Sequence, residues 1–327
     1  MKFAKVFIII FVLISYYPSI GSAQVNHVVL VSLDGFKPDA ISQFEKELPH
    51  FHRLMTEGSY TLNARTDVNY TVTIPNHTCM LTGRRVAGEN GHRVTVNGQT
   101  NKTVHQLNGQ YVSSIFDVLS QHGLSSTMAA SKLKFDIFSK SYPITKTHIT
   151  DQDDGQTLQY VLEQLKTDPP AFFFVHFSNL DATGHAEGWS VDGSSSYMKA
   201  VFKIDEYLGQ LMDEIELLNA KEESTVLIIT TDHGGINKSH ENALNKKNYT
   251  IPFFLWGKNV PWGKDLYELN QDARMNPGEK QIQYENSKQP IRNGDAGNLA
   301  LHLLGLECIP QSTINCSSPL VVEEPVK

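Results

Sequence analysis

The sequence predicts an α/β fold, a three-layer α/β/α sandwich with a mostly parallel central sheet. Two observations predict it. The strand-like segments are continuous apolar runs rather than alternating ones, which is typical of strands covered on both faces. Helical segments alternate with them along the chain, as parallel strands joined by crossover helices require.

The first half of the chain supplies two strands and three helices. Residues 28–32 are a β-branched run that predicts the first strand. A helix is expected to begin around Pro75, with Thr73 near its N-cap. Apolar spacing predicts helices at 111–122 and 157–166, with a strand at 126–131 between them.

The second half continues the alternation. Residues 172–177 are a continuous apolar strand, and 195–218 form a long amphipathic helix. Two more apolar strands are expected at 225–230 and 251–256, and a helix at 296–304 closes the chain. No internal repeat or linker divides the sequence, so residues 24–327 are expected to form a single domain.

Composition excludes several classes of protein. The chain has 327 residues, of which 40% are hydrophobic, with 28 basic and 35 acidic residues and a net charge of −7. It is too apolar for a disordered chain, and its acidic balance argues against a nucleic-acid-binding surface. Three cysteines are too few for a disulfide scaffold. Cys308 and Cys316 could close a small C-terminal clip, which leaves Cys79 as a buried free thiol.

Residues 1–23 resemble a secretory signal peptide. Lys2 and Lys5 precede a short apolar run, and the segment ends in the small residues Gly21-Ser22-Ala23. The alternative, an anchoring helix, is less favoured because the run is shorter than the roughly 20 residues that span a bilayer. We expect a secreted or periplasmic protein with no membrane span.

Three acidic residues follow predicted strands directly. Asp34, Asp181 and Asp232 each stand where a strand ends, and the carboxyl ends of parallel strands form the sites of such sheets. Histidines accompany them: His185 follows Asp181 in Asp-Ala-Thr-Gly-His, His233 follows Asp232 in Asp-His-Gly-Gly, and His240 comes seven residues later. Each alone could be a turn, a helix cap or a core histidine. Together they indicate a site for Zn²⁺ or Mn²⁺.

Thr73 has two possible roles. It could simply cap the helix that begins near Pro75, or its hydroxyl could be a nucleophile. The positive end of the helix would favour a phosphate beside it. Local features do not separate the two roles.

These motifs resemble the alkaline phosphatase superfamily, in particular its type I phosphodiesterases and nucleotide pyrophosphatases. The resemblance covers nearly the whole chain, in the order Leu33-Asp-Gly-Phe36, Thr73-Ile-Pro-Asn-His77, Asp181-Ala-Thr-Gly-His185 and Thr231-Asp-His-Gly-Gly235. It implies an alkaline-phosphatase-like catalytic domain and an exported hydrolase of small phosphate esters. Because Thr73 stands where sulfatases carry an oxidisable cysteine or serine, sulfatase chemistry is not expected.

The resemblance also implies roles for individual residues. It implies two Zn²⁺ ions per chain, or Mn²⁺ or another divalent ion in their place. One ion would take Asp181, His185 and His240, and the other would take Asp34, Asp232, His233 and the hydroxyl of Thr73. Thr73 would attack phosphorus and form a covalent phosphoryl-threonine. Asn97, the nearest counterpart of a family asparagine, would help to hold the phosphoryl oxygens.

The substrate stays open at this stage. A phosphodiesterase or nucleotide pyrophosphatase is expected, the alternatives being a phosphomonoesterase with the same site or a catalytically dead binding protein. A monoesterase needs extra positive charge for its phosphoryl group, and Lys132 and Lys134 are candidates to supply it. We expect both lysines to be solvated instead.

Overall fold

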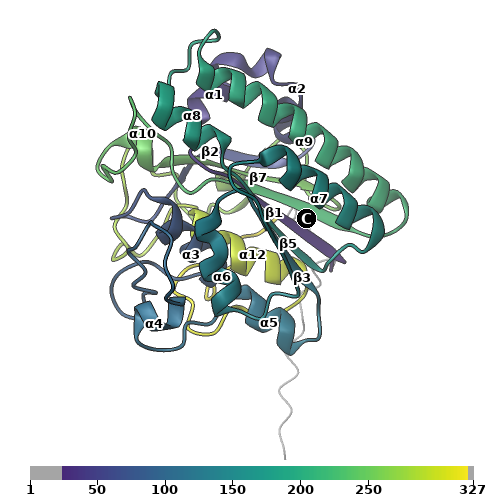
Figure 1. Ribbon diagram of the computed structural model, residues 1–327, viewed down its shortest axis with the longest axis vertical. Coiled ribbons are helices and arrows are strands. Elements are labelled where there is room, and N and C mark those ends of the chain that lie inside the picture. The colour runs from purple at the N-terminus through teal and green to yellow at the C-terminus, as the bar shows by residue number, and fades with distance from the viewer. Residues whose placement is uncertain (1–23, 323–327) are drawn as a thin grey trace, which may run out of the picture.

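The computed structural model describes residues 24–322, which form one eight-stranded sheet with helices on both faces (Figure 1). The strand order is β4-β3-β5-β1-β6-β7-β2-β8. The five strands from β4 to β6 are parallel, and β7 runs antiparallel to both of its neighbours, β6 and β2. The strands are β1 (His27–Leu33), β2 (Ser59–Arg65), β3 (Ser126–Ala130), β4 (Lys146–Ile149), β5 (Phe172–Phe177), β6 (Thr225–Thr230), β7 (Thr250–Gly257) and β8 (Lys264–Asp265).

The helices form two layers. One face of the sheet is covered by α1 (Pro38–Phe44), α2 (Pro49–Thr56), α7 (Asp154–Thr167), α8 (Asn179–Glu187) and α9 (Ser196–Ala220). The other is covered by α3 (Thr73–Thr82), α4 (Val104–Asn108), α5 (Ile115–Gln121), α6 (Asp136–Ser141), α11 (Leu266–Leu269) and α12 (Ala296–Leu303). The short α10 (Lys246–Tyr249) precedes β7. This is the predicted three-layer α/β/α sandwich.

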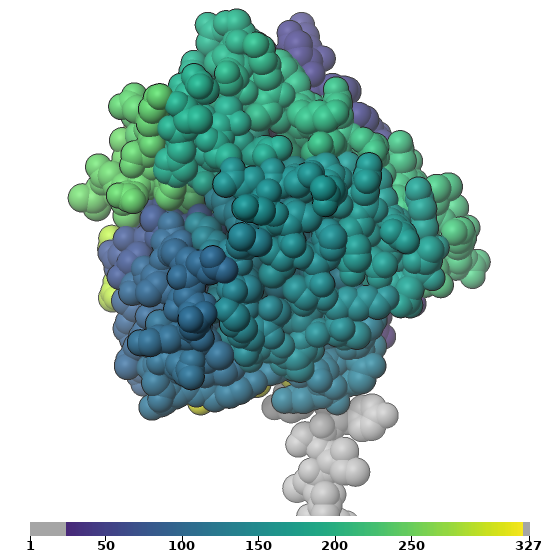
Figure 2. All heavy atoms as spheres, in the orientation of Figure 1, coloured from purple at the N-terminus to yellow at the C-terminus, as the bar shows by residue number. Residues whose placement is uncertain are grey.

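The central strands are buried on both faces, which explains their continuous apolar sequences. In β1, Val28 and Leu30 belong to one core, whereas Val29 and Val31 belong to the other. The space-filling view shows side chains closing the gaps between the ribbons (Figure 2). Burial of this kind contributes about 25 cal/mol for each Å² of apolar surface removed from water.

Every predicted strand and helix is present. β5 and β6 have the predicted bounds, and the ends of the other elements differ from the prediction by at most four residues. The helix expected at 111–122 begins only at Ile115, because Ser114 and Asp117 form a capping box that starts α5 there. Strands β2, β4 and β8 were not predicted. The expected signal peptide, residues 1–23, lies outside the described residues. Within residues 24–322, no helix has the length and apolar character needed to cross a membrane.

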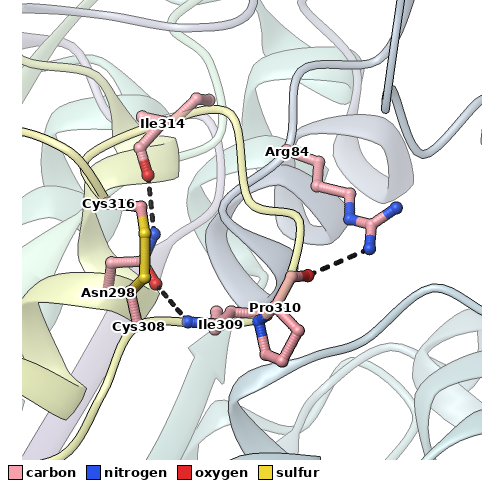
Figure 3. The surroundings of a disulfide bond; sticks show 7 residues. All are labelled: Arg84, Asn298, Cys308, Ile309, Pro310, Ile314 and Cys316. Atoms are coloured by element: carbon pink, nitrogen blue, oxygen red, sulfur yellow. Dashed lines mark hydrogen bonds between the residues drawn. A yellow bond between two sulfur atoms is a disulfide. The ribbon is translucent and has the colours of Figure 1, made fainter. Parts of the chain in front are cut away.

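A disulfide fastens the C-terminal loop beside helix α3. Cys308 and Cys316 are bonded, and Cys79 is a buried free thiol, as expected. Asn298 of α12 accepts from the backbone of Ile309 and donates to that of Ile314. Arg84, just past the end of α3, donates to the carbonyl of Pro310 (Figure 3). The loop therefore supports the helix that begins at Thr73.

Candidate functional site

The sheet brings three aspartates to one edge. Strands β5, β1 and β6 are adjacent and parallel, so their carboxyl ends place Asp181, Asp34 and Asp232 together. All three side chains are buried. Three carboxylates so close in a buried place require positive charge between them.

The acidic and imidazole groups form two clusters. Asp181, His185 and His240 offer one set of ligand atoms, and Asp34, Asp232 and His233 offer another, with the atoms of each set within 4.8 Å of one another. His185 Nε2 lies 3.3 Å from Asp181 Oδ1, and His240 Nε2 lies 3.6 Å from the same oxygen. His233 Nε2 lies 3.1 Å from Asp232 Oδ2 and 3.6 Å from Asp34 Oδ1. The structure thus groups these six residues as the resemblance implies.

The two clusters fit divalent cations because four of their ligand atoms, and the hydroxyl of Thr73, are buried without a hydrogen-bond partner. Buried polar atoms without a hydrogen bond are rare in proteins. Within residues 24–322 they include, at this edge, Asp34 Oδ1, Thr73 Oγ1, Asp181 Oδ1, Asp232 Oδ2 and His233 Nε2. Carboxylate, imidazole and hydroxyl groups in such sets are suited to zinc.

Electrostatics lead to the same conclusion. Burial, and next the charge of Asp34, raise the pKa of Asp232 well above its usual value. The positive charge of Lys132 does not outweigh these two effects, so the protein alone leaves the negative charge of Asp232 under-compensated. Burial also lowers the pKa of His233, which keeps its imidazole neutral, the form that binds metals.

Thr73 is the first residue of α3. Val72 is the N-cap, so Thr73 stands directly beside it, near the N-cap as predicted, and does not itself cap the helix. The Thr73 side chain is 1% exposed, yet its hydroxyl has no hydrogen-bond partner in the described structure. His77 Nδ1 donates to the Thr73 carbonyl at 2.8 Å and lies 3.7 Å from Asp232 Oδ2. The hydroxyl therefore stands at the positive end of the helix, beside the second cluster.

Asn97 lies at the same helix end. Its Oδ1 accepts from the backbone N–H of Ile74 at 3.0 Å, which leaves the two amide hydrogens of its side chain available for another partner. The structure therefore brings Asn97 beside the candidate nucleophile despite the offset in sequence spacing.

Lys132 is not solvated, so that expectation was wrong. Its ammonium lies between two aspartates, 2.6 Å from Asp34 Oδ2 and 2.6 Å from Asp181 Oδ2. Burial alone would raise the pKa of Asp34, but Lys132 and the hydrogen bond from His176 hold it well below its usual value. Lys132 uses the Oδ2 atoms and leaves both Oδ1 atoms free, so the lysine and the proposed cations do not compete for the same oxygens.

Two supporting residues were missed from the sequence. His176, within β5, donates to Asp34 Oδ2 at 2.9 Å and so orients that carboxylate. Trp189 packs so closely on Gly184 and Gly235 that a Cβ at either glycine would lie about 2.2 Å from its ring. This contact explains why Gly184 and Gly235 have no side chain. For His176, the only signal in the sequence was that a polar residue stands inside an apolar strand. For Trp189, no signal in the sequence indicated this packing role.

Comparison with known proteins gives a consistent result. The family described as type I phosphodiesterase / nucleotide pyrophosphatase matches residues 28–293. The chain is 26% identical over 218 residues to human ectonucleotide pyrophosphatase/phosphodiesterase family member 1, which covers 63% of this chain and 23% of that protein. It is 24% identical over 241 residues to bis(5′-adenosyl)-triphosphatase from Bos taurus. That alignment covers 69% of this chain and 51% of the bovine protein. The matched part of the chain thus spans about a quarter of the first relative and about half of the second.

Solved structures share the fold. Murine ectonucleotide pyrophosphatase/phosphodiesterase 5, described as an inactive threonine-to-alanine variant in complex with AMP, superposes with a TM-score of 0.62 at 18% identity. The match covers 87% of this chain and 96% of that one. A protein of the alkaline phosphatase superfamily from Vibrio parahaemolyticus superposes with a TM-score of 0.58 at 14% identity. That match covers 92% of this chain and 72% of the other chain.

Proposed function

The chain belongs to the type I phosphodiesterase / nucleotide pyrophosphatase family, and on that premise we propose that it is a two-metal hydrolase of nucleotide phosphodiesters and pyrophosphates, with Thr73 as its nucleophile. Residues 24–327 would form its single catalytic domain. The observation that carries the proposal is the set of buried, unpartnered polar atoms, which comprises the Thr73 hydroxyl and four ligand atoms of the two clusters. Such atoms are costly to bury unless a ligand satisfies them.

The proposed cations would be held by the two clusters. One divalent ion, which we propose to be zinc, would be bound by Asp181, His185 and His240. Asp34, Asp232, His233 and the Thr73 hydroxyl would bind the other. Bound there, the ions would supply Lewis-acid charge beside the phosphoryl group.

The residues of the chain would carry the reaction in two displacements. Thr73 Oγ1 attacks phosphorus and gives up its proton, so that a new O–P bond forms while the bond to the leaving oxygen breaks and the departing alcohol takes up a proton from solvent. Asn97 donates to a phosphoryl oxygen, and the N-terminus of α3 adds positive potential. Water then attacks phosphorus from the opposite side, the Thr73 O–P bond breaks, and the hydroxyl regains its proton.

We expect hydrolysis to depend on the metal. The zinc-loaded protein should cleave the aryl diester of thymidine 5′-phosphate, and a chelator should lower the rate by on the order of 10³, since metal catalysis contributes several kcal/mol. Added zinc should restore the rate. Release of aryl alcohol is read by absorbance. Unchanged turnover after the chelator has removed all zinc would contradict the two-metal proposal.

We also propose that the protein is exported after loss of residues 1–23. The basic and apolar pattern of that segment supports export, as does the Cys308–Cys316 disulfide, which is stable in oxidising compartments. Mature protein recovered from outside the cytoplasm should begin at Gln24. An N-terminus at Met1 in that fraction would argue against cleavage.

A further inference from the structure

A cavity of about 350 Å³ lies outside the metal clusters. Residues from three segments line it, within 272–274, 284–295 and 313–318. The last of these includes the end of the disulfide loop, part of which Figure 3 shows. Neither Thr73 nor any of the six cluster residues lines the cavity. Its volume is at the small end of the range for pockets that bind small molecules.

Positive charge is in excess in the lining of this cavity. Arg274 and Arg292 are 6% and 1% exposed, and the half-buried Lys288 lies beside them. The carboxylates of the lining are Asp295, which is buried, and Asp272, which is exposed. Three cations therefore share one buried carboxylate. Such an excess is stabilised by a ligand that carries negative charge.

The hydrogen bonds of these groups leave donors unused. Asp295 Oδ1 accepts from Arg274 Nη2 at 3.0 Å, and its Oδ2 accepts from the backbone N–H of Arg292. The Arg292 side chain forms no ion pair within residues 24–322 and donates only to neutral oxygens, those of Thr66, Gln281, Ile282 and Gln289. Arg274 Nε is buried without a hydrogen-bond partner. A buried donor of this kind is costly unless a ligand accepts from it.

A further arginine lies next to the cavity. The ring of Tyr284, a lining residue, has Arg292 Cζ 4.5 Å and Arg85 Cζ 5.6 Å from its centroid. Arg85 forms no ion pair in the described part of the chain, and its Nε is also buried without a partner. The buried Asp67, which accepts from the Tyr284 hydroxyl at 2.9 Å, supplies one negative charge in return. Positive charge thus remains in excess here as well.

These groups suit a phosphoryl group better than a carboxylate. Guanidinium groups match the geometry of phosphate oxygens and donate to two of them at once. The hydroxyls of Ser287, Thr313 and Ser317 also line the cavity and can donate to further oxygens. A phosphate monoester carries about two negative charges at neutral pH and three acceptor oxygens. A carboxylate offers one charge and two oxygens.

One short turn belongs both to the cavity and to the metal edge. In η3 (Asn293–Asp295), Asp295 lines the cavity, as does Arg292 just before the turn. Asn293 donates instead to Asn76 Oδ1 at 3.0 Å and to the carbonyl of Asp232 at 3.4 Å. A ligand in the cavity would therefore rest on the turn that supports Asp232 without itself occupying a metal cluster.

We propose that this cavity is a second binding site, which takes the doubly charged phosphoryl group of a small phosphate monoester or of inorganic phosphate. The inference goes beyond the proposed hydrolysis, because no residue of the cavity takes part in that reaction. One such anion would be held at the metal edge and another in the cavity.

The test is calorimetry of the zinc-loaded full chain with thymidine 5′-phosphate. We expect the parent protein to bind two molecules per chain. Ser317→Glu adds a carboxylate at an exposed position of the lining. It should weaken the binding of one of the two molecules by at least about tenfold, since like charges brought together repel. The kcat/KM for the aryl diester should keep its parental value, because the metal edge is untouched.

A second variant and two controls make the result specific. Arg274→Gln removes a buried cation and should weaken the same molecule; if that variant does not fold, Ser317→Glu still decides. Ser120→Glu places the same charge on the exposed side of α5, outside the cavity, and should bind both molecules as the parent does. Thymidine, which lacks the phosphoryl group, should not bind in the cavity. Inorganic phosphate is titrated alongside, and whichever of the two anions binds the cavity more tightly identifies the source of the phosphoryl group.

Two results would overturn the inference. Binding of a single anion per parent chain, with unchanged affinity in Ser317→Glu, would leave only the metal edge and let the proposed hydrolysis stand. Binding of thymidine as tightly as thymidine 5′-phosphate would show that the cavity recognises no phosphoryl group. In contrast, a parent protein without zinc-dependent turnover that still binds one anion, and loses it in Ser317→Glu, would refute the proposed hydrolysis and support the second site.

Discussion

Replacing Thr73 by alanine should abolish turnover of every phosphoric ester that the protein cleaves. The Thr73 hydroxyl is buried, has no hydrogen-bond partner among residues 24–322, and stands at the start of α3. Removing the nucleophile of a covalent mechanism lowers kcat by roughly 10⁴-fold or more. Steady-state rates of the zinc-loaded variant against the aryl diester of thymidine 5′-phosphate measure the loss.

Two controls separate chemistry from folding in this variant. Thr73→Ser retains a hydroxyl and should keep measurable turnover. Thr167→Ala, at the exposed end of α7, should behave as the parent protein. Thr73→Ala should also keep an unchanged melting temperature, because the hydroxyl it removes makes no hydrogen bond. Full activity in Thr73→Ala would refute the nucleophile assignment.

Replacing Asp232 by alanine should remove one of two zinc ions. Its Oδ2 is buried and unpartnered, 3.1 Å from His233 Nε2 and in the cluster with Asp34. Losing that ion should lower turnover on the order of 10³-fold, since each 1.4 kcal/mol of lost stabilisation costs a factor of ten. Zinc per chain is read by elemental mass spectrometry and turnover by absorbance.

The matched control for this variant is Asp213→Ala, which removes an exposed carboxylate of α9. It should retain two zinc ions and parental activity. His240→Ala should lower zinc content to the same extent as Asp232→Ala by emptying the other cluster. Two zinc ions per chain in Asp232→Ala would contradict its assignment as a ligand.

The parts of the fold that the sequence predicts are those with a strong local signal. Strands β5 and β6 are six-residue runs that are apolar apart from His176 and the threonines at the ends of β6. Their bounds were predicted correctly because burial on both faces favours apolar residues at successive positions. Strands β2 and β4 lie toward the edges of the sheet and include half-buried positions. Their mixed sequences resemble loops, so pattern alone did not identify them.

The site residues, too, could be predicted where a local sequence signal marks them and not where their contacts depend on the order of the strands. Asp34, Asp181 and Asp232 could be predicted because each follows a recognisable strand, and the carboxyl ends of parallel strands share an edge. Lys132 could not, because its contacts with Asp34 and Asp181 depend on β3 lying next to β5 and β5 next to β1. That order joins residues 98 and 49 positions apart in sequence. Local patterns carry no information on such pairings.

The most direct test of the central claim is to trap the intermediate on Thr73. The zinc-loaded protein is mixed with the aryl diester of thymidine 5′-phosphate, quenched in acid within the first turnover, digested and analysed by mass spectrometry. A thymidylyl group on Thr73, absent from Thr73→Ala, is the predicted result. Full first-turnover release of the aryl alcohol with no adduct on Thr73, or with the adduct on another residue, would contradict the proposed mechanism.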